Sequence, residues 1–133
     1  MKNDYELRIY YEDTDVGGVV YHSMYLNFIE RARSEIFFKN GISPIDHEFH
    51  FVVKEINAKF LKSAKLGDEL KIETNVIKIR NASIKLNQII FFKENPEIKV
   101  FEAIVDLVCL KGDKISKIPL SFENIFNQNY EKY

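Results

Sequence analysis

The stretch from residue 11 to residue 33 concentrates the side chains that could do chemistry. It reads YEDTDVGGVVYHSMYLNFIERAR and places Asp13 and Asp15 before a glycine pair, with His22 just after it. A glycine pair exposes backbone N–H groups, and a helix that follows it points its unpaired N–H groups and the positive end of its dipole at the same space. This arrangement suits a developing oxyanion on an acyl carbonyl, beside a carboxylate that acts as general base or nucleophile.

Other chemistries fit this stretch poorly. Asp13 and Asp15 begin like an EF-hand, but the twelfth position of such a loop is Met24 instead of glutamate. The loop lacks the glycine pattern of a dinucleotide-binding turn, and no Gly-Lys-Ser/Thr ending marks a phosphate-binding loop. The chain has no G-x-S-x-G elbow, and His47 and His50 lack H-E-x-x-H spacing. We therefore expect no metal site.

The cluster also has a purely structural interpretation. Aspartate and glycine are common turn residues, and for Asp13 we favour a role in satisfying loop amides. Taken alone, a histidine near a helix start, such as His22, is more often structural than catalytic. Cys109 lies in a strongly apolar stretch, which favours a packing role over that of a nucleophile.

Periodicity indicates how the cluster is positioned. Apolar residues recur at spacings of three and four from about residue 21 to residue 39, which predicts a long helix with Ser23 as N-cap and Asn40-Gly41 as its stop. A short second helix is expected over residues 43–47. A first strand is expected over residues 6–12.

The remaining chain is dominated by β patterns. Long strands are predicted at about residues 50–62, 69–80, 83–93 and 98–111, residues 115–118 could extend the sheet, and residues 119–127 predict a terminal helical turn or two. Short connections imply an antiparallel sheet, against which the single long helix must bury its apolar stripe. The predicted class is therefore a two-layer α+β domain spanning residues 1–133.

Composition excludes several classes of protein. The 133 residues carry 19 basic and 20 acidic side chains, a net charge of −1, which disfavours a nucleic-acid partner. The single cysteine cannot form an internal disulfide, which favours a reducing, cytoplasmic location. No stretch of the sequence reads as a signal peptide or a transmembrane segment.

The run Y-x-D-T-D-x-x-G-V-V-Y-H-x-x-Y-L-x-F-x-E-x-A-R resembles the motif of the hotdog-fold thioesterases in the 4-hydroxybenzoyl-CoA thioesterase family. It is most similar to the bacterial acyl-CoA thioesterases associated with the Tol–Pal system. The resemblance continues through F-L-K-S-A-K-L-G-D-E-L-K-I-E-T (residues 60–74), Gln88 and Ile118-Pro119, and so covers nearly the whole chain. It implies a hotdog fold, in which an antiparallel sheet of about five strands wraps around one long helix.

The resemblance also implies roles for individual residues. The catalytic aspartate of the family falls on Asp15, and His22 matches a histidine beside it. The loop whose amides would polarise the thioester carbonyl corresponds to Gly18, Val19, Val20 and Tyr21. Tyr25 matches a tyrosine in the first turn of the helix that lines the pocket. Arg80 and Ser83 match an R-x-x-S element that helps to hold CoA, although a solvated strand-end arginine is an equally good interpretation of Arg80.

Two further features qualify the resemblance. Glu30, Arg31 and Arg33 match its E-R-A-R signature, and for these charges we favour surface or interfacial ion pairs. Ser63 stands where the family usually has proline, a change expected to alter rigidity rather than chemistry.

The function implied by the resemblance is hydrolysis of an acyl-CoA in lipid metabolism, without cofactor, with acyl carrier protein as an alternative carrier. A domain this small leaves little interior for substrate, so a homodimer that assembles into a homotetramer is expected. Two alternatives stay open. One is a hotdog hydratase or dehydratase that uses His22 and Glu30, and the other is a Tol–Pal-associated scaffold protein with weak hydrolysis.

Overall fold

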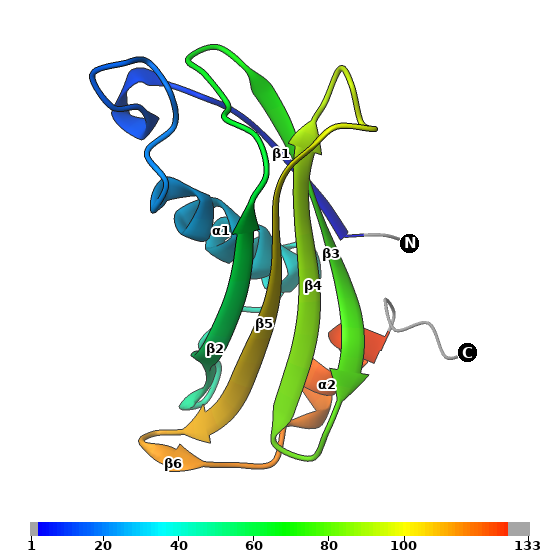
Figure 1. Cartoon of the computed structure of the whole chain (residues 1–133). Coiled ribbons are helices and arrows are strands. Elements are labelled where there is room, and N and C mark those ends of the chain that lie inside the picture. The colour runs from blue at the N-terminus through cyan, green and yellow to red at the C-terminus, as the bar shows by residue number, and fades with distance from the viewer. Residues whose placement is uncertain (1–2, 128–133) are drawn as a thin grey trace.

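The structure is a computed structural model that describes residues 3–127 (Figure 1). In chain order the elements are β1 (Asn3–Arg8), a 3-10 turn η1 (Tyr11–Asp13), α1 (Met24–Lys39), β2 (Phe49–Phe60), β3 (Glu69–Ile79), β4 (Ser83–Phe92), β5 (Lys99–Lys111), β6 (Lys114–Ile115) and α2 (Leu120–Asn127).

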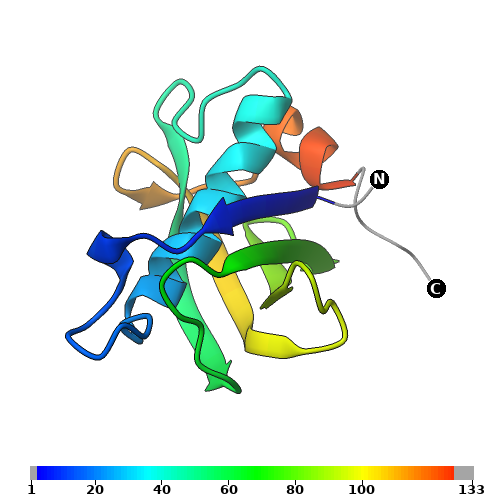
Figure 2. The same cartoon turned by 90° about the horizontal axis from the view of Figure 1, so that it is seen from above.

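The sheet is antiparallel throughout and runs in the order β1-β3-β4-β5-β2, with the short β6 paired to β5. It curves around α1, which lies along its concave face (Figures 1 and 2). Irregularities in strand register between Val53 and Glu55 and between Val76 and Lys78 are typical of bulges, which bend strands. The predicted α+β hotdog fold is confirmed, with six strands instead of about five.

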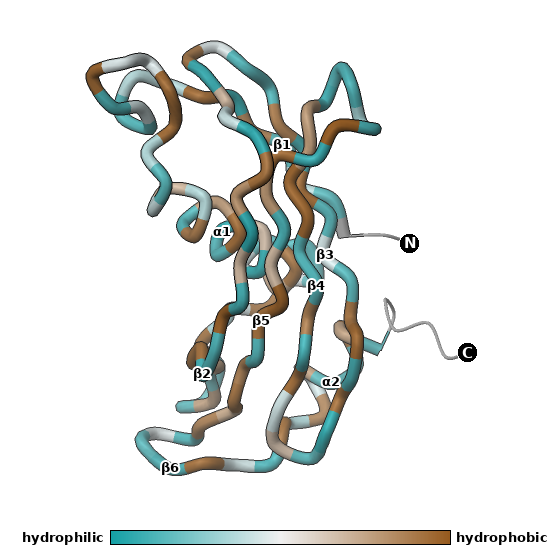
Figure 3. The backbone as a smooth tube through the Cα atoms, viewed as in Figure 1, coloured by the Kyte–Doolittle hydropathy of each residue, from teal (hydrophilic) through white to brown (hydrophobic). Residues whose placement is uncertain are grey.

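The core forms where the apolar stripe of α1 meets the concave face of the sheet. Fully or nearly fully buried side chains on this stripe are Tyr25, Phe28, Ile29, Ala32, Ile36 and Phe37. Along β3, β4 and β5, hydrophobic and hydrophilic positions alternate, as the colours of Figure 3 show. At one end α2 packs Phe122 and Phe126 against Phe37 and Phe51, which closes the core there.

One predicted element, the first strand, is present with different bounds, and another, the short second helix, is wrong. The first strand ends at Arg8 instead of residue 12, because the amide of Tyr10 donates to a carboxylate oxygen of Asp13 and the chain turns into η1. Residues 43–47 form a loop instead of a helix. His47 and Glu48 adopt φ angles of 49° and 71°, which a right-handed helix cannot contain.

Other boundaries differ in smaller ways. Ser23 occupies the N-cap position of α1 as predicted, but its side chain makes no capping hydrogen bond. Only Lys114–Ile115 of the predicted extension pairs with β5. The terminal helix is confirmed as α2.

Candidate active site

Asp15 lies in the loop between η1 and α1, where it organises a tight turn. Its Oδ1 atom accepts a 2.8 Å hydrogen bond from the amide of Gly17, and its backbone carbonyl accepts a 3.1 Å bond from the amide of Gly18. A Cβ atom on residue 17 would lie 3.3 Å from this oxygen, so glycine allows the close approach. The second carboxylate oxygen, Oδ2, has no partner within residues 3–127, and the residue is exposed. One oxygen is therefore anchored and the other is available to a ligand.

Asp13, the first aspartate of the D-T-D run, has the structural role that the sequence favoured. It is only 3% exposed, and its Oδ2 atom accepts a 2.9 Å hydrogen bond from the amide of Tyr10. Its backbone carbonyl accepts a 3.0 Å bond from the amide of Tyr21. Asp13 thus closes the base of the loop that presents Asp15.

A second segment, residues 64–68, holds this loop in place. The amide of Val20 donates to the carbonyl of Ala64 at 2.9 Å, and the amide of Leu66 donates to the carbonyl of Gly18 at 3.0 Å. The amide of Ala64 in turn donates to the hydroxyl of Tyr25 at 3.1 Å. The two most distinctive sequence motifs therefore lie against each other and support one site.

The available amide donors are fewer than the sequence predicts. The amides of Gly18, Val20 and Tyr21 donate to the carbonyls of Asp15, Ala64 and Asp13. Within residues 3–127, the amides of Val19, His22 and Ser23 make no hydrogen bond. These three N–H groups lie in the loop that carries Asp15 and at the start of α1, into which this loop leads. The motif could not predict which amides are free, because the tertiary structure decides which carbonyl groups accept hydrogen bonds from the others.

The side chains of His22 and Tyr25 have different environments. His22 is exposed, its ring lies 4.6 Å from that of Tyr21 and 6.3 Å from that of Phe60, and in the described part of the chain no hydrogen bond joins it to Asp15. Tyr25 is buried and stacks on Phe101 with ring centres 5.4 Å apart. Burial raises the pKa of Tyr25, a shift that the hydrogen bond from Ala64 opposes, so the phenol is neutral near pH 7.

Arg80 and Ser83 lie elsewhere in the chain. They close the hairpin between β3 and β4, where the amide of Arg80 donates to the carbonyl of Ser83 at 2.8 Å. This hairpin lies at the opposite end of the sheet from the loop that carries Asp15 (Figure 1). A single chain therefore does not bring the predicted CoA-binding pair to the predicted catalytic residue.

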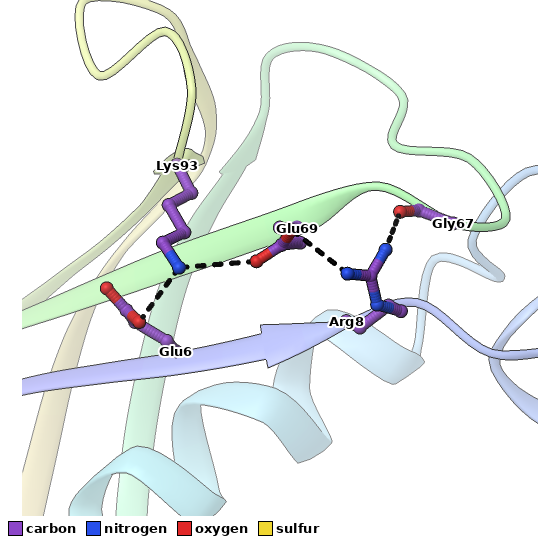
Figure 4. A network of polar contacts seen from close by, with 5 residues as sticks. All are labelled: Glu6, Arg8, Gly67, Glu69 and Lys93. Atoms are coloured by element: carbon purple, nitrogen blue, oxygen red, sulfur yellow. Dashed lines mark hydrogen bonds and ion pairs between the residues drawn. The ribbon is translucent and has the colours of Figure 1, made fainter.

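A polar network around Arg8, which the sequence did not predict, also supports residues 64–68 (Figure 4). Arg8 donates to the carbonyl of Gly67 at 2.8 Å and to the carboxylate of Glu69 at 3.0 Å. Lys93 joins Glu69 at 3.3 Å and Glu6 at 3.4 Å. The hydrogen bond and charge of Lys93 lower the pKa of Glu69. The only sequence signal for this network was that Arg8 is one of four arginines.

The surface position expected for the charges of the E-R-A-R signature is wrong for Arg33. It is buried and makes no ion pair within the described residues, because its guanidinium donates instead to the amide oxygen of Gln88 at 2.9 Å. Gln88 in turn donates to the carbonyl of Ile29 and the hydroxyl of Thr74, both at 3.0 Å. Desolvation lowers the pKa of Arg33, although an arginine keeps its charge at any physiological pH.

Residues 3–127 show two further properties of the chain. No helix among them is both long and apolar enough to cross a membrane. No group of three or more His, Cys, Asp or Glu side chains in this range is placed to hold a metal ion.

Comparison with known proteins identifies relatives. An acyl-CoA thioesterase named YbgC from Helicobacter pylori is 45% identical over 128 residues, covering 90% of this chain and 96% of the relative. An acyl-CoA thioester hydrolase named YbgC from Escherichia coli is 35% identical over 125 residues, covering 92% and 93%. The crystal structure of a probable thioesterase from Bartonella henselae superposes with a TM-score of 0.82 at 28% identity, covering 90% of this chain and all of that one.

More distant structures share the fold. A Staphylococcus aureus protein in complex with CoA superposes with a TM-score of 0.87 at 11% identity, covering all of this chain and 88% of that one. The family model described as the thioesterase superfamily matches residues 17–99, which is more than half of the chain. The chain therefore belongs to the thioesterase superfamily.

Proposed function

We propose that this protein hydrolyses acyl-CoA thioesters and that Asp15 is its catalytic carboxylate. The observation that carries the proposal is that Asp15, with one oxygen anchored by Gly17 and the other free, lies in the same loop as Val19, and that this loop leads into the start of α1, where the amides of His22 and Ser23 are unpaired in the described residues. The relatives from Helicobacter pylori and Escherichia coli, both named for acyl-CoA hydrolysis, support the same reaction.

The geometry supports a simple reaction sequence. The thioester carbonyl oxygen accepts hydrogen bonds from the free amides, which stabilise the negative charge of the tetrahedral intermediate. Asp15 removes a proton from water, and the hydroxide oxygen bonds to the carbonyl carbon. In the alternative, Asp15 attacks the carbon itself and water then cleaves the anhydride. Breaking the C–S bond releases the CoA thiolate, and His22 orients water or assists departure of the thiolate, which takes up a proton.

The proposed assembly is a homodimer that forms a homotetramer. β2 is an edge strand of the sheet, and it exposes Val52 and Val53, which are 39% and 43% accessible in the single chain. An exposed apolar edge favours pairing with another strand. A second copy would also allow Arg80 and Ser83 of one chain to approach Asp15 of another. A sedimentation profile that shows a monomer at micromolar concentration would contradict this assembly.

We also propose a cytoplasmic location, a role in lipid metabolism, and acyl carrier protein as an alternative carrier.

The central test is the substitution Asp15→Asn, with Asp113→Asn in the exposed β5–β6 turn as the matched control. Free thiol released from acyl-CoAs of acetyl to palmitoyl length is measured for folded proteins. We expect Asp15→Asn to lose about 100-fold or more in kcat, the typical contribution of such a group, and the control to match wild type. Near wild-type turnover in Asp15→Asn would refute the assignment. Hydration of crotonyl-CoA without thiol release would indicate a hydratase, and no turnover of any acyl-CoA would indicate a scaffold.

A further inference from the structure

The loop that carries Asp15 belongs to a small antiparallel ladder of three short segments. Residues 13–15 pair with residues 19–21, and residues 19–21 pair in turn with residues 64–66. The bridging pairs of this ladder are Thr14 with Val20 and Val19 with Lys65. Such a short ladder is barely stable alone, so its outer segment, residues 64–66, needs support from the rest of the fold to hold Asp15 in place.

Asp68 pairs with the outer side of residues 64–66. Its Oδ2 atom accepts a 2.8 Å hydrogen bond from the amide of Lys65, and its own amide donates to the carbonyl of Lys65 at 3.0 Å. Lys65 forms a non-hydrogen-bonded pair with Val19, so its N–H and C=O groups point away from that partner. Asp68 satisfies both groups, and its carboxylate takes the place that the carbonyl of a neighbouring strand would occupy.

The backbone of Asp68 is joined to the end of β1. The amide of Ile9, just after β1, donates to the carbonyl of Asp68 at 2.9 Å, and the carbonyl of Ile9 accepts from the amide of Gly67 at 2.9 Å. Ile9 is almost completely buried and belongs to the hydrophobic core. Asp68 therefore connects the small ladder that carries Asp15 to the core of the fold.

We propose that Asp68 is a positioning residue for Asp15 and acts through the backbone of Lys65. This inference rests on the proposed function, because Asp15 is the group that Asp68 would position. Without the Oδ2 acceptor, the amide of Lys65 loses its partner, and residues 64–66 hold residues 19–21 less closely. The carboxylate of Asp15 then spends less time in the reactive position, and a displacement of about 1 Å can cost about 100-fold in rate.

Kinetics of acyl-CoA hydrolysis by variants at position 68 test the proposal. Asp68 is half-buried in a turn, so its variants should fold. Asp68→Ala removes the acceptor and should lower kcat about tenfold, with KM within about twofold of wild type, because the substrate still binds. Asp68→Asn keeps an acceptor oxygen, which makes a weaker hydrogen bond, and should bring kcat to within about threefold of wild type. Asp113→Ala, in the exposed β5–β6 turn, is the control and should match wild type.

The same substitution in the Asp15→Asn background separates positioning from a loss of stability. If Asp68 acts through Asp15, Asp68→Ala should cause no further fall in kcat once Asp15 is replaced. A purely structural role would lower kcat by the same factor in both backgrounds. Where Asp68→Ala fails to fold, Asp68→Glu takes its place, because its longer side chain moves the carboxylate away from the position that the Lys65 amide requires.

Hydrogen exchange of backbone amides gives a measurement that needs no substrate. The amides of Val20 and Leu66 donate across the ladder to the carbonyls of Ala64 and Gly18. Asp68→Ala should speed exchange at these two amides about tenfold, because the ladder opens more often. Exchange at Val105, which is buried in the middle of β5, should stay as in wild type.

Several results would overturn the proposal. One is a kcat of Asp68→Ala equal to that of wild type. Another is an equal loss of kcat in Asp68→Ala and Asp68→Asn, which would assign the effect to charge rather than to the hydrogen-bond acceptor. A third is the same fractional loss in the wild-type and Asp15→Asn backgrounds. Failure of the proposed function gives a different pattern, because Asp15→Asn itself would keep its turnover, whatever the exchange rates of Val20 and Leu66.

Discussion

The hydroxyl of Tyr25 accepts a 3.1 Å hydrogen bond from the amide of Ala64, which joins the first turn of α1 to the segment that holds the loop of Asp15. Both residues are almost completely buried. The carbonyl of the same alanine accepts from Val20, so Ala64 links the helix and the loop through its two backbone polar groups. This residue pair is therefore one of the contacts that fix the loop of Asp15 relative to the start of α1.

Replacing Tyr25 with phenylalanine should destabilise the fold. The ring would still stack on Phe101, but the buried amide of Ala64 would lose its partner, at a cost of about 1–3 kcal/mol. Urea unfolding measures the change. Tyr11→Phe is the control, because Tyr11 is 82% exposed and its loss of a hydroxyl should be neutral. Equal stabilities of the two variants would show that the Ala64 bond contributes nothing.

Tyr25 should also make stability depend on alkaline pH. Because burial raises the pKa of Tyr25 in the folded state, the unfolded chain releases this proton first, from about pH 10 upward. The contribution of Tyr25 is thus complete below about pH 10 and is lost as the pH rises toward the folded-state pKa. The stability difference between wild type and Tyr25→Phe should narrow above pH 10, by at most about 1.4 kcal/mol per pH unit. A constant difference from pH 8 to pH 11 would contradict this expectation.

Much of the fold could be predicted because its signals are local. The long helix and the four long strands carry their own periodicity, and Gly112 with Asp113 marks the last hairpin. The misplaced end of the first strand and the absent second helix depend on information that periodicity lacks. The end of β1 is set by the bond between Tyr10 and Asp13, and the Ser43-Pro44 start of a helix is overridden by left-handed backbone at His47 and Glu48.

The candidate site could be predicted in part. The motif pointed to Asp15 and the loop, because a carboxylate beside a glycine pair and a helix start is a recognisable local pattern. It could not identify the free amides, because the carbonyl that engages Val20 belongs to Ala64, far along the chain. It also misjudged Arg33. Charged side chains on a helix usually face solvent, and only the buried partner Gln88 reveals that this one does not.

Arg8 should act as a positioning residue for the proposed reaction. Arg8→Met removes the hydrogen bond to the carbonyl of Gly67, whose segment holds the loop of Asp15. We expect kcat to fall about three- to tenfold with little change in KM, because the substrate still binds but the loop is held less tightly. Stability should change by no more than about 1 kcal/mol, since the network is exposed.

Two further variants separate positioning by Arg8 from a general effect of lost charge. Arg8→Lys should restore part of kcat. Lys71→Met removes the 3.2 Å ion pair with Asp4 between the same two strands without touching residues 64–68, and its kcat should equal that of wild type. An equal loss of kcat in Arg8→Met and Lys71→Met would refute the positioning role.

Gln88 and its neighbour Asn87 provide a matched pair for the buried network. Gln88→Leu would leave Arg33, Thr74 and the carbonyl of Ile29 without their hydrogen-bond partner in the core, and should destabilise the fold by about 3 kcal/mol or more. Asn87 points to the other face of β4, and its side-chain oxygen is buried without a partner, so Asn87→Leu should be neutral or stabilising. Urea unfolding of both variants checks the contrast. Similar losses in the free energy of unfolding for the two variants would mean that removing any amide side chain from β4 destabilises the fold. They would also mean that the hydrogen bond from Arg33 to Gln88 makes no special contribution to stability.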